Sequence, residues 1–211
     1  MWTEQGKAVL DEYRARKARE DRLFEEISRD DMLSRRDEFL LSVGEDVAFF
    51  LHDLVTASGA QRIVELGTSY GFSTLFLANA ARLTGGQVIT IDVADYKQAS
   101  ARESLSRAGL GEHVEWRLGD ALEILAELEG PIDFVLLDIW KDLYIPCFEA
   151  FYPRLAHRAL VAADNMIYPE IYWEAGREYQ SRVLAKPDMQ SLLLAIGHGI
   201  ELSTRWLPDQ R

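Results

Sequence analysis

Two acidic strand ends and a nearby lysine are the residues of this 211-residue chain that could do chemistry together. The apolar run in VLLDIWKDLY is typical of a buried parallel strand; it stops at Asp138, and Lys141 follows three residues later. A second apolar run farther along the chain ends in Asp164 and Asn165. Because parallel strands bring their carboxyl ends to one edge of a sheet, we expect these four side chains to face one site.

Two carboxylates and an amide make an all-oxygen set of donors. Such a set suits a hard cation such as Mg²⁺ and leaves coordination positions for water or substrate. In a simpler interpretation, Asp138 and Asp164 only terminate strands and Asn165 makes an Asx-turn. The coincidence of both strand ends with Lys141 favours the metal site.

A strand, a glycine turn and a helix predict the first unit of a doubly wound sheet. The strand covers 62–66, the turn GTSYGFS contains Gly67 and Gly71, and the helical pattern begins at Thr74. Such a turn presents backbone N–H groups to a ligand. Its G-x-x-x-G spacing lacks the central glycine of the G-x-G-x-x-G fingerprint, which disfavours a dinucleotide-binding oxidoreductase.

Two further acidic residues indicate where an adenosine-containing cofactor would bind. The predicted strand 87–91 ends at Asp92, which is placed to accept hydrogen bonds from ribose hydroxyls. Asp120 is expected to cap the helix that follows it, with Glu123 at the capping-box position, to lie near the adenine ring, or to do both. These positions fit either a nicotinamide dinucleotide or S-adenosylmethionine.

The remaining patterns predict a single α/β domain, 1–211, with a helical cap at 1–42 and a Rossmann-like core at 43–211. Ser42 and Glu45 have the spacing of a capping box for a helix that Gly59 closes. The other expected helices cover 4–30, 95–107, 141–151 and 170–184, and the other expected strands cover 113–116, 160–163, 189–196 and 200–205. The last two strands are joined so closely that they must form an antiparallel hairpin.

Composition argues against several classes of partner and site. A net charge of −12 and an isoelectric point near 4.8 disfavour nucleic acid. The lone Cys147 cannot form an internal disulfide, and we expect a half-buried thiol rather than a nucleophile. No signal-peptide pattern or long apolar stretch is present, so we expect a soluble cytoplasmic protein with no membrane partner. The isolated histidines predict neither a zinc site nor a catalytic triad, and a monomer and a homodimer are both compatible with the sequence.

The segments DIWKDLY and VAADNMIYP closely resemble the metal and catalytic segments of catechol O-methyltransferase and related magnesium-dependent O-methyltransferases that use S-adenosylmethionine. The resemblance runs from about Glu38 to the C-terminus. It implies a doubly wound, mostly parallel seven-stranded sheet with a C-terminal antiparallel hairpin. It also implies methyl transfer to a small catechol-like acceptor, with S-adenosylmethionine and Mg²⁺ as cofactors.

The resemblance assigns roles to individual residues. Lys141 matches the general base. The metal ligands match Asp138, Asp164 and Asn165. Residues that match the cofactor site are Val43, Glu65, Gly67, Ser73, Asp92, Gly119, Asp120, Ala121, Asp138 and Trp140. We expect Trp140 and the segment 166–169 to wall the aromatic ring of the acceptor, and Leu194 to stand at about the point where the mammalian catechol enzyme has an acidic residue.

Two other functions remain open from the sequence. One is a nicotinamide-dependent oxidoreductase built on a similar sheet, against which the glycine spacing speaks. The other is a non-catalytic nucleotide-binding or sensing domain, in which the acidic strand ends would be structural. Retention of Lys141 together with all three presumed metal ligands favours the methyltransferase over this second alternative.

Overall fold

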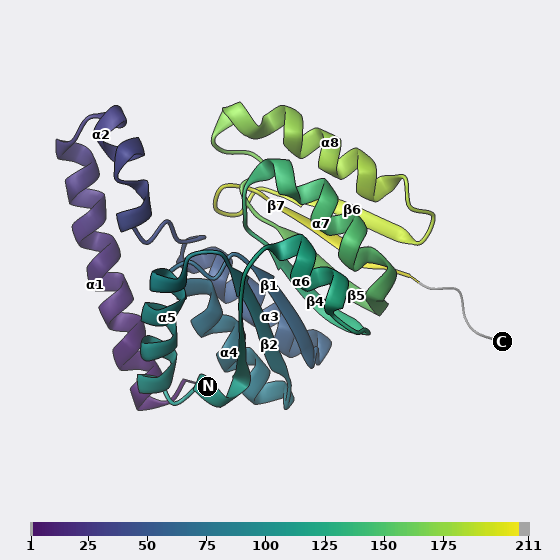
Figure 1. The fold of residues 1–211 in the computed structure, drawn as a ribbon, viewed down its shortest axis with the longest axis horizontal. Coiled ribbons are helices and arrows are strands. Elements are labelled where there is room, and N and C mark those ends of the chain that lie inside the picture. Colours follow the sequence, from purple (N-terminus) through teal and green to yellow (C-terminus); the bar gives the residue numbers. More distant parts are fainter. Residues whose placement is uncertain (1, 207–211) are drawn as a thin grey trace.

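A computed structural model describes residues 2–206 and contains a seven-stranded sheet of order β3-β2-β1-β4-β5-β7-β6 (Figure 1). The strands are β1 (Arg62–Leu66), β2 (Gln87–Asp92), β3 (Val114–Leu118), β4 (Ile132–Leu137), β5 (Leu155–Ala163), β6 (Met189–Leu194) and β7 (Ile200–Arg205). The first five pair in parallel, and β7 runs antiparallel between β5 and β6. The predicted fold class and the C-terminal hairpin are confirmed.

Helices cover both faces of the sheet. They are α1 (Glu4–Glu26), α2 (Arg29–Ser34), α3 (Glu45–Ser58), α4 (Phe72–Thr84), α5 (Asp95–Arg107), α6 (Ala121–Glu127), α7 (Tyr144–Phe151) and α8 (Trp173–Leu184). The buried side chains of α1, α3, α4 and α5 form one core cluster, and those of α6, α7 and α8 form another. No helix within the described residues has the length and apolarity needed to cross a bilayer.

The central strand β4 shows why the strands of this sheet appear in the sequence as runs of apolar residues. Phe134 and Leu136 pack into the first cluster, whereas Val135 and Leu137 pack into the second. Successive side chains of a strand point to opposite faces, so a sheet covered on both faces needs apolar residues at every position. All four of these side chains are fully buried.

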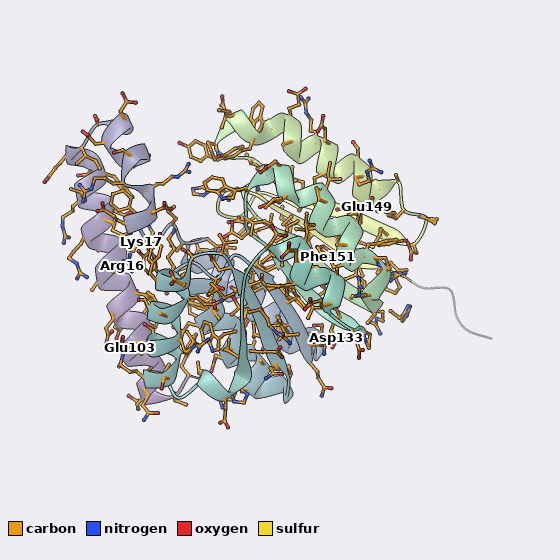
Figure 2. All side chains as sticks on the ribbon, viewed as in Figure 1. Arg16, Lys17, Glu103, Asp133, Glu149 and Phe151 are labelled. Atoms are coloured by element: carbon orange, nitrogen blue, oxygen red, sulfur yellow. The ribbon has the colours of Figure 1, made fainter. Side chains whose placement is uncertain are left out.

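Helix α7 packs inward as its pattern predicted. Tyr144, Phe148 and Phe151 are fully buried beneath it, and Figure 2 labels Phe151. Cys147 is also fully buried rather than half-buried, and this burial raises the pKa of its thiol to about 12. A buried thiol with a raised pKa carries little thiolate, which is typical of a structural cysteine.

The N-terminal helix α1 does more than cover the body, because it braces the glycine turn. It lies alongside α5 (Figure 1), and Val9, Leu10 and Tyr13 are buried beneath it. The Tyr13 hydroxyl donates to the carbonyl oxygen of Tyr70 at 2.6 Å. The guanidinium of Arg16, labelled in Figure 2, lies 3.9 Å from the centroid of the Tyr70 ring.

The predicted capping box of α3 is wrong. Gly44, with φ of 88°, is the N-cap residue, and no side chain caps the helix. Glu45 therefore occupies the first helical position, whereas a capping box needs it at the third. Its carboxylate instead accepts a hydrogen bond from Nε of Arg14 at 3.0 Å. Gly59 ends the helix in the left-handed conformation, as predicted.

Gly67 directly follows β1 and lies against the backbone of Asp138, which directly follows β4. Its φ is 100°, and a Cβ atom here would lie 2.1 Å from the carbonyl oxygen of Asp138. Gly67→Ala is therefore expected to lower the free energy of unfolding by about 3 kcal/mol, measured by urea denaturation. The control is Gly85→Ala, where φ is 70° but a Cβ meets nothing within 4 Å. This control should cost only about 1 kcal/mol, and equal losses would refute the steric argument.

Candidate functional site

A cavity of about 540 Å³ lies at the carboxyl ends of the central strands. The predicted site residues that line it are Val43, Gly67, Ser73, Asp92, Gly119, Asp120, Ala121, Asp138, Trp140, Lys141 and Asn165. Glu65 and Asp164 are not among its lining residues; both are buried behind the wall. Tertiary folding thus brings almost the whole predicted set to one cavity.

Glu65 supports the cavity from behind the glycine turn. Its carboxylate accepts hydrogen bonds from the hydroxyls of Ser73, Thr74 and Thr90, each at 2.6 Å. Burial raises the pKa of Glu65 to about 7 despite these three donors, and the negative charge of Asp138 raises it slightly further. Glu65 therefore contacts the cavity wall through Ser73, whose position at the start of α4 it holds, and through Thr90, which is hydrogen-bonded to the cavity residue Thr68.

The raised pKa of Glu65 predicts a pH dependence of stability. The folded protein holds this proton up to about pH 7, whereas a glutamate in the unfolded chain releases it near 4.5. The associated stabilisation is complete below pH 4.5 and is lost as the pH rises to about 7, a loss of roughly 3 kcal/mol. Glu65→Gln cannot ionise at this position. Between pH 4.5 and about 7, its free energy of unfolding should therefore fall by roughly 3 kcal/mol less than that of the wild type.

Urea denaturation at about pH 5 and about pH 8 measures the difference between the two proteins. Glu127→Gln, which changes an exposed glutamate on α6, is the control and should follow the wild type. If Glu65→Gln also loses as much stability as the wild type between the two pH values, Glu65 does not titrate in this interval.

Asp92 joins the end of β2 to the glycine turn. One carboxylate oxygen accepts from the backbone N–H of Ser69 at 2.7 Å, and the other accepts from that of Ala94 at 2.8 Å. Each oxygen has a second lone pair available, and the residue lines the cavity. The side chain is thus held in place to accept hydrogen bonds from a vicinal diol such as that of ribose.

The turn after β3 forms a further part of the cavity wall. Gly119 has φ of 146°, and the side chain of Asp120 accepts from the backbone N–H groups of Leu122 at 2.8 Å and Glu123 at 3.1 Å. The predicted cap of α6 is confirmed. Because Asp120 also lines the cavity beside Ala121, capping does not remove it from the cavity wall.

Lys141 lies among the acidic strand ends, with only 9% of its surface exposed. Its Nζ donates to the backbone carbonyl oxygen of Asp164 at 2.5 Å and lies 3.6 Å from the centroid of the Tyr144 ring. Burial lowers the pKa of Lys141, although the charges of Asp138 and Asp164 oppose this shift. Burial also raises the pKa of both carboxyl groups, and the charge of Asp164 raises that of Asp138 further. These conditions favour a neutral amine that can accept a proton.

Asp164 has a carboxylate oxygen that lacks a partner. Its Oδ1 is buried without a hydrogen bond from any described residue, while Oδ2 accepts from Nδ2 of Asn165 at 3.2 Å. An unpaired buried oxygen costs free energy, and a bound cation would remove that cost. Within residues 2–206 no three His, Cys, Asp or Glu side chains cluster to hold a metal ion. A metal at this place would therefore need the Asn165 amide beside the carboxylates of Asp138 and Asp164.

The segment 166–169 does not line the cavity, contrary to our expectation. Its N–H groups donate to the carbonyl oxygens of His198 and Gly199 at 2.8 to 3.0 Å, so the turn between β6 and β7 holds it. Tyr172 contributes to the cavity wall in its place. Trp140 lines the cavity as expected, and with 53% of its surface exposed it is not a core residue.

The N-terminal cap supplies cavity residues that the sequence analysis missed. This cap contributes Arg36, Asp37, Leu40, Leu41 and Ser42 to the cavity wall. The guanidinium of Arg36 lies over the Trp140 ring, 4.5 Å from its centroid. The change from charged to apolar residues in RRDEFLLS, directly before Val43, is the signal that could have indicated this role.

Comparison with known proteins shows which family this chain resembles. The family described as O-methyltransferase matches residues 15–205. Catechol O-methyltransferase of Niastella koreensis is 34% identical over 131 residues, which cover 60% of this chain and 59% of the relative. Its counterpart in Mycobacterium tuberculosis is 36% identical over 129 residues, which cover 60% and 58%. The matches thus span less than two thirds of these relatives.

A solved structure resembles the fold over most of its length. It is the O-methyltransferase TomG from Streptomyces achromogenes, which is involved in tomaymycin synthesis and was crystallised with S-adenosylmethionine. The TM-score is 0.74 at 25% identity, and the match covers 83% of this chain and 87% of that one. The likeness therefore extends over most of both chains.

Proposed function

This chain belongs to the O-methyltransferase family, and we propose that it transfers a methyl group from S-adenosylmethionine to one hydroxyl of a small vicinal dihydroxy aromatic. In this proposal Asp138, Asp164 and Asn165 hold Mg²⁺ and Lys141 is the general base. The observation that carries it is the buried Lys141 amine beside Asp164, whose Oδ1 has no hydrogen-bond partner among the described residues. The two catechol O-methyltransferase relatives support the same class of acceptor.

The cavity offers complementary groups for each part of S-adenosylmethionine. Asp92 would accept hydrogen bonds from the ribose, and the turn at 119–121 would border the adenine. Val43 and Ser73 would border the methionine carboxylate, close to the N-terminus of α4. No side chain of residues 2–206 caps that terminus at Gly71, so its N–H groups and its positive end are available to an anion.

The acidic strand ends suit a hard divalent cation because all their donors are oxygen atoms. When bound, S-adenosylmethionine supplies an electrophilic methyl group, and Mg²⁺ chelated by a vicinal diol lowers the pKa of its hydroxyls. Asp138 and Asp164 supply negative charge for the cation, and Asn165 supplies a neutral oxygen. Asn165 has φ of 53°, and this backbone turn places its side chain on the cavity wall.

Lys141 would accept the proton of the reacting hydroxyl at Nζ. Its hydrogen bond to the Asp164 carbonyl oxygen positions this atom, and burial favours its neutral form. Negative and positive reactants neutralise each other in methyl transfer, so water would stabilise them more than the transition state. Trp140 and Tyr172, which line the cavity, would exclude water and orient the ring of the acceptor.

The test is formation of S-adenosylhomocysteine from S-adenosylmethionine with a panel of catechols and monophenols, with Mg²⁺ and with a chelator. The proposal expects turnover that needs Mg²⁺ and is confined to vicinal diols. Turnover that a chelator does not affect would refute the metal role, and no turnover by a protein that still binds the cofactor would refute the acceptor class. The family match does not favour the nicotinamide-dependent alternative.

A further inference from the structure

One cationic side chain of the cavity has no part in the proposed reaction. Among the described residues that line the cavity, the cations are Arg36, Lys97 and Lys141. Lys141 belongs to the proposed base and metal site, and Nζ of Lys97 donates to a carboxylate oxygen of Asp37 at 3.2 Å. Arg36 has no carboxylate partner within residues 2–206, and its guanidinium instead contacts the Trp140 ring.

The acids closest to Arg36 in the chain are already engaged. Glu38 accepts hydrogen bonds from Nε and Nη2 of Arg35 at 3.1 and 2.9 Å, and Asp37 binds Lys97. The Arg36 side chain is exposed and lines the cavity, and its guanidinium is not neutralised by either of these acids. Its positive charge is available to an anion that enters from outside.

Arg36 lies on the side of the cavity where the acceptor would bind. Its partner Trp140 directly precedes Lys141 and follows Asp138 by two positions. An aromatic ring whose hydroxyls reach Lys141 and Asp138 would lie beside Trp140 and turn its opposite end toward Arg36. A guanidinium placed over an aromatic face keeps its N–H edge free for two parallel hydrogen bonds to a carboxylate.

We infer that the preferred acceptor is a vicinal dihydroxy aromatic that carries a carboxylate, and that Arg36 is the specificity-determining residue that binds this carboxylate. The inference rests on the proposed function, which defines where the two hydroxyls lie. It goes beyond that function by specifying the charge of the acceptor and the residue that recognises it.

The test compares kcat/KM for a vicinal dihydroxybenzoate with kcat/KM for the dihydroxybenzyl alcohol of the same ring pattern. The wild type should favour the acid, and Arg36→Gln should lower the acid-to-alcohol ratio about tenfold, mainly through KM for the acid. The matched control is Arg35→Gln, whose side chain pairs with Glu38; it should keep the ratio within about twofold of the wild type. A wild type that favours the alcohol, or two variants that behave alike, would overturn the inference.

A binding measurement separates this inference from the proposed function. Calorimetric titration of the dihydroxybenzoate into protein loaded with S-adenosylhomocysteine needs no turnover. If no catechol is methylated, the proposed function fails, but acid binding that Arg36→Gln and added salt both weaken would still support the role of Arg36. Absence of binding, or binding that Arg36→Gln leaves unchanged, would refute that role.

Discussion

Lys141→Ala is expected to lower kcat by about two to four orders of magnitude, because the reacting hydroxyl would lose its proton acceptor. The Kd for S-adenosylmethionine should change by less than about threefold, since the groups proposed to bind the ribose and adenine lie on β2 and after β3. Initial rates at saturating substrates and calorimetric titration of the cofactor measure the two quantities separately.

Three further variants make this prediction specific. Lys141→Met keeps most of the side-chain stem and should lose as much activity, which excludes a simple packing defect. Lys186→Ala removes a lysine that pairs instead with Glu149, labelled in Figure 2, and should keep kcat within about twofold. Asp92→Ala should mainly raise the Kd of the cofactor. If Lys141→Ala and Asp92→Ala show the same pattern, the division of roles is wrong.

Asp164→Asn is expected to weaken Mg²⁺ binding and to lower kcat/KM, each by about a hundredfold. The substitution keeps the shape of the side chain but replaces an oxygen that lacks a partner and removes a negative charge. In the absence of metal the variant should be at least as stable as the wild type, because burial penalises the charge of this carboxylate. Titration of the rate with Mg²⁺ and thermal unfolding in the presence of a chelator measure the two effects.

Asp142 offers a matched control for Asp164→Asn. Asp142 is an exposed acid beside Lys141, and it does not line the cavity. Asp142→Asn should leave the Mg²⁺ dependence within about twofold of the wild type. If Asp164→Asn retains the normal Mg²⁺ dependence, or loses activity only because it unfolds, the proposed metal site is wrong.

Much of the fold could be predicted from the sequence because local patterns determine it. Residues 134–137 of β4 are all apolar, since a parallel strand covered on both faces has no solvent-facing side. The glycines at 67 and 59 mark backbone conformations that other residues rarely adopt. The grouping of Asp138 with Asp164 followed from the same logic, because neighbouring parallel strands must end at the same edge of the sheet.

Other features could not be predicted because they depend on contacts between distant parts of the chain. The S-x-x-E spacing at Ser42 was misleading because the backbone turns at Gly44, so Glu45 begins the helix and pairs with Arg14. The segment 166–169 was misplaced because hydrogen bonds to the hairpin turn hold it. Gly44 permits this backbone turn, but the pairing of Glu45 with Arg14 and the hydrogen bonds of 166–169 leave no signal in the local sequence.

The sequence by itself determined the succession of strands and helices along the chain, because hydrophobic periodicity and turn chemistry are local properties. It also determined which residue types stand at the strand ends. Only the tertiary structure decided that Glu65 lies behind the cavity, that one oxygen of Asp164 lacks a partner, and that Arg36 lies over Trp140. The physical reason is that burial, and with it the pKa of an acid or an amine, depends on which distant side chains surround the group.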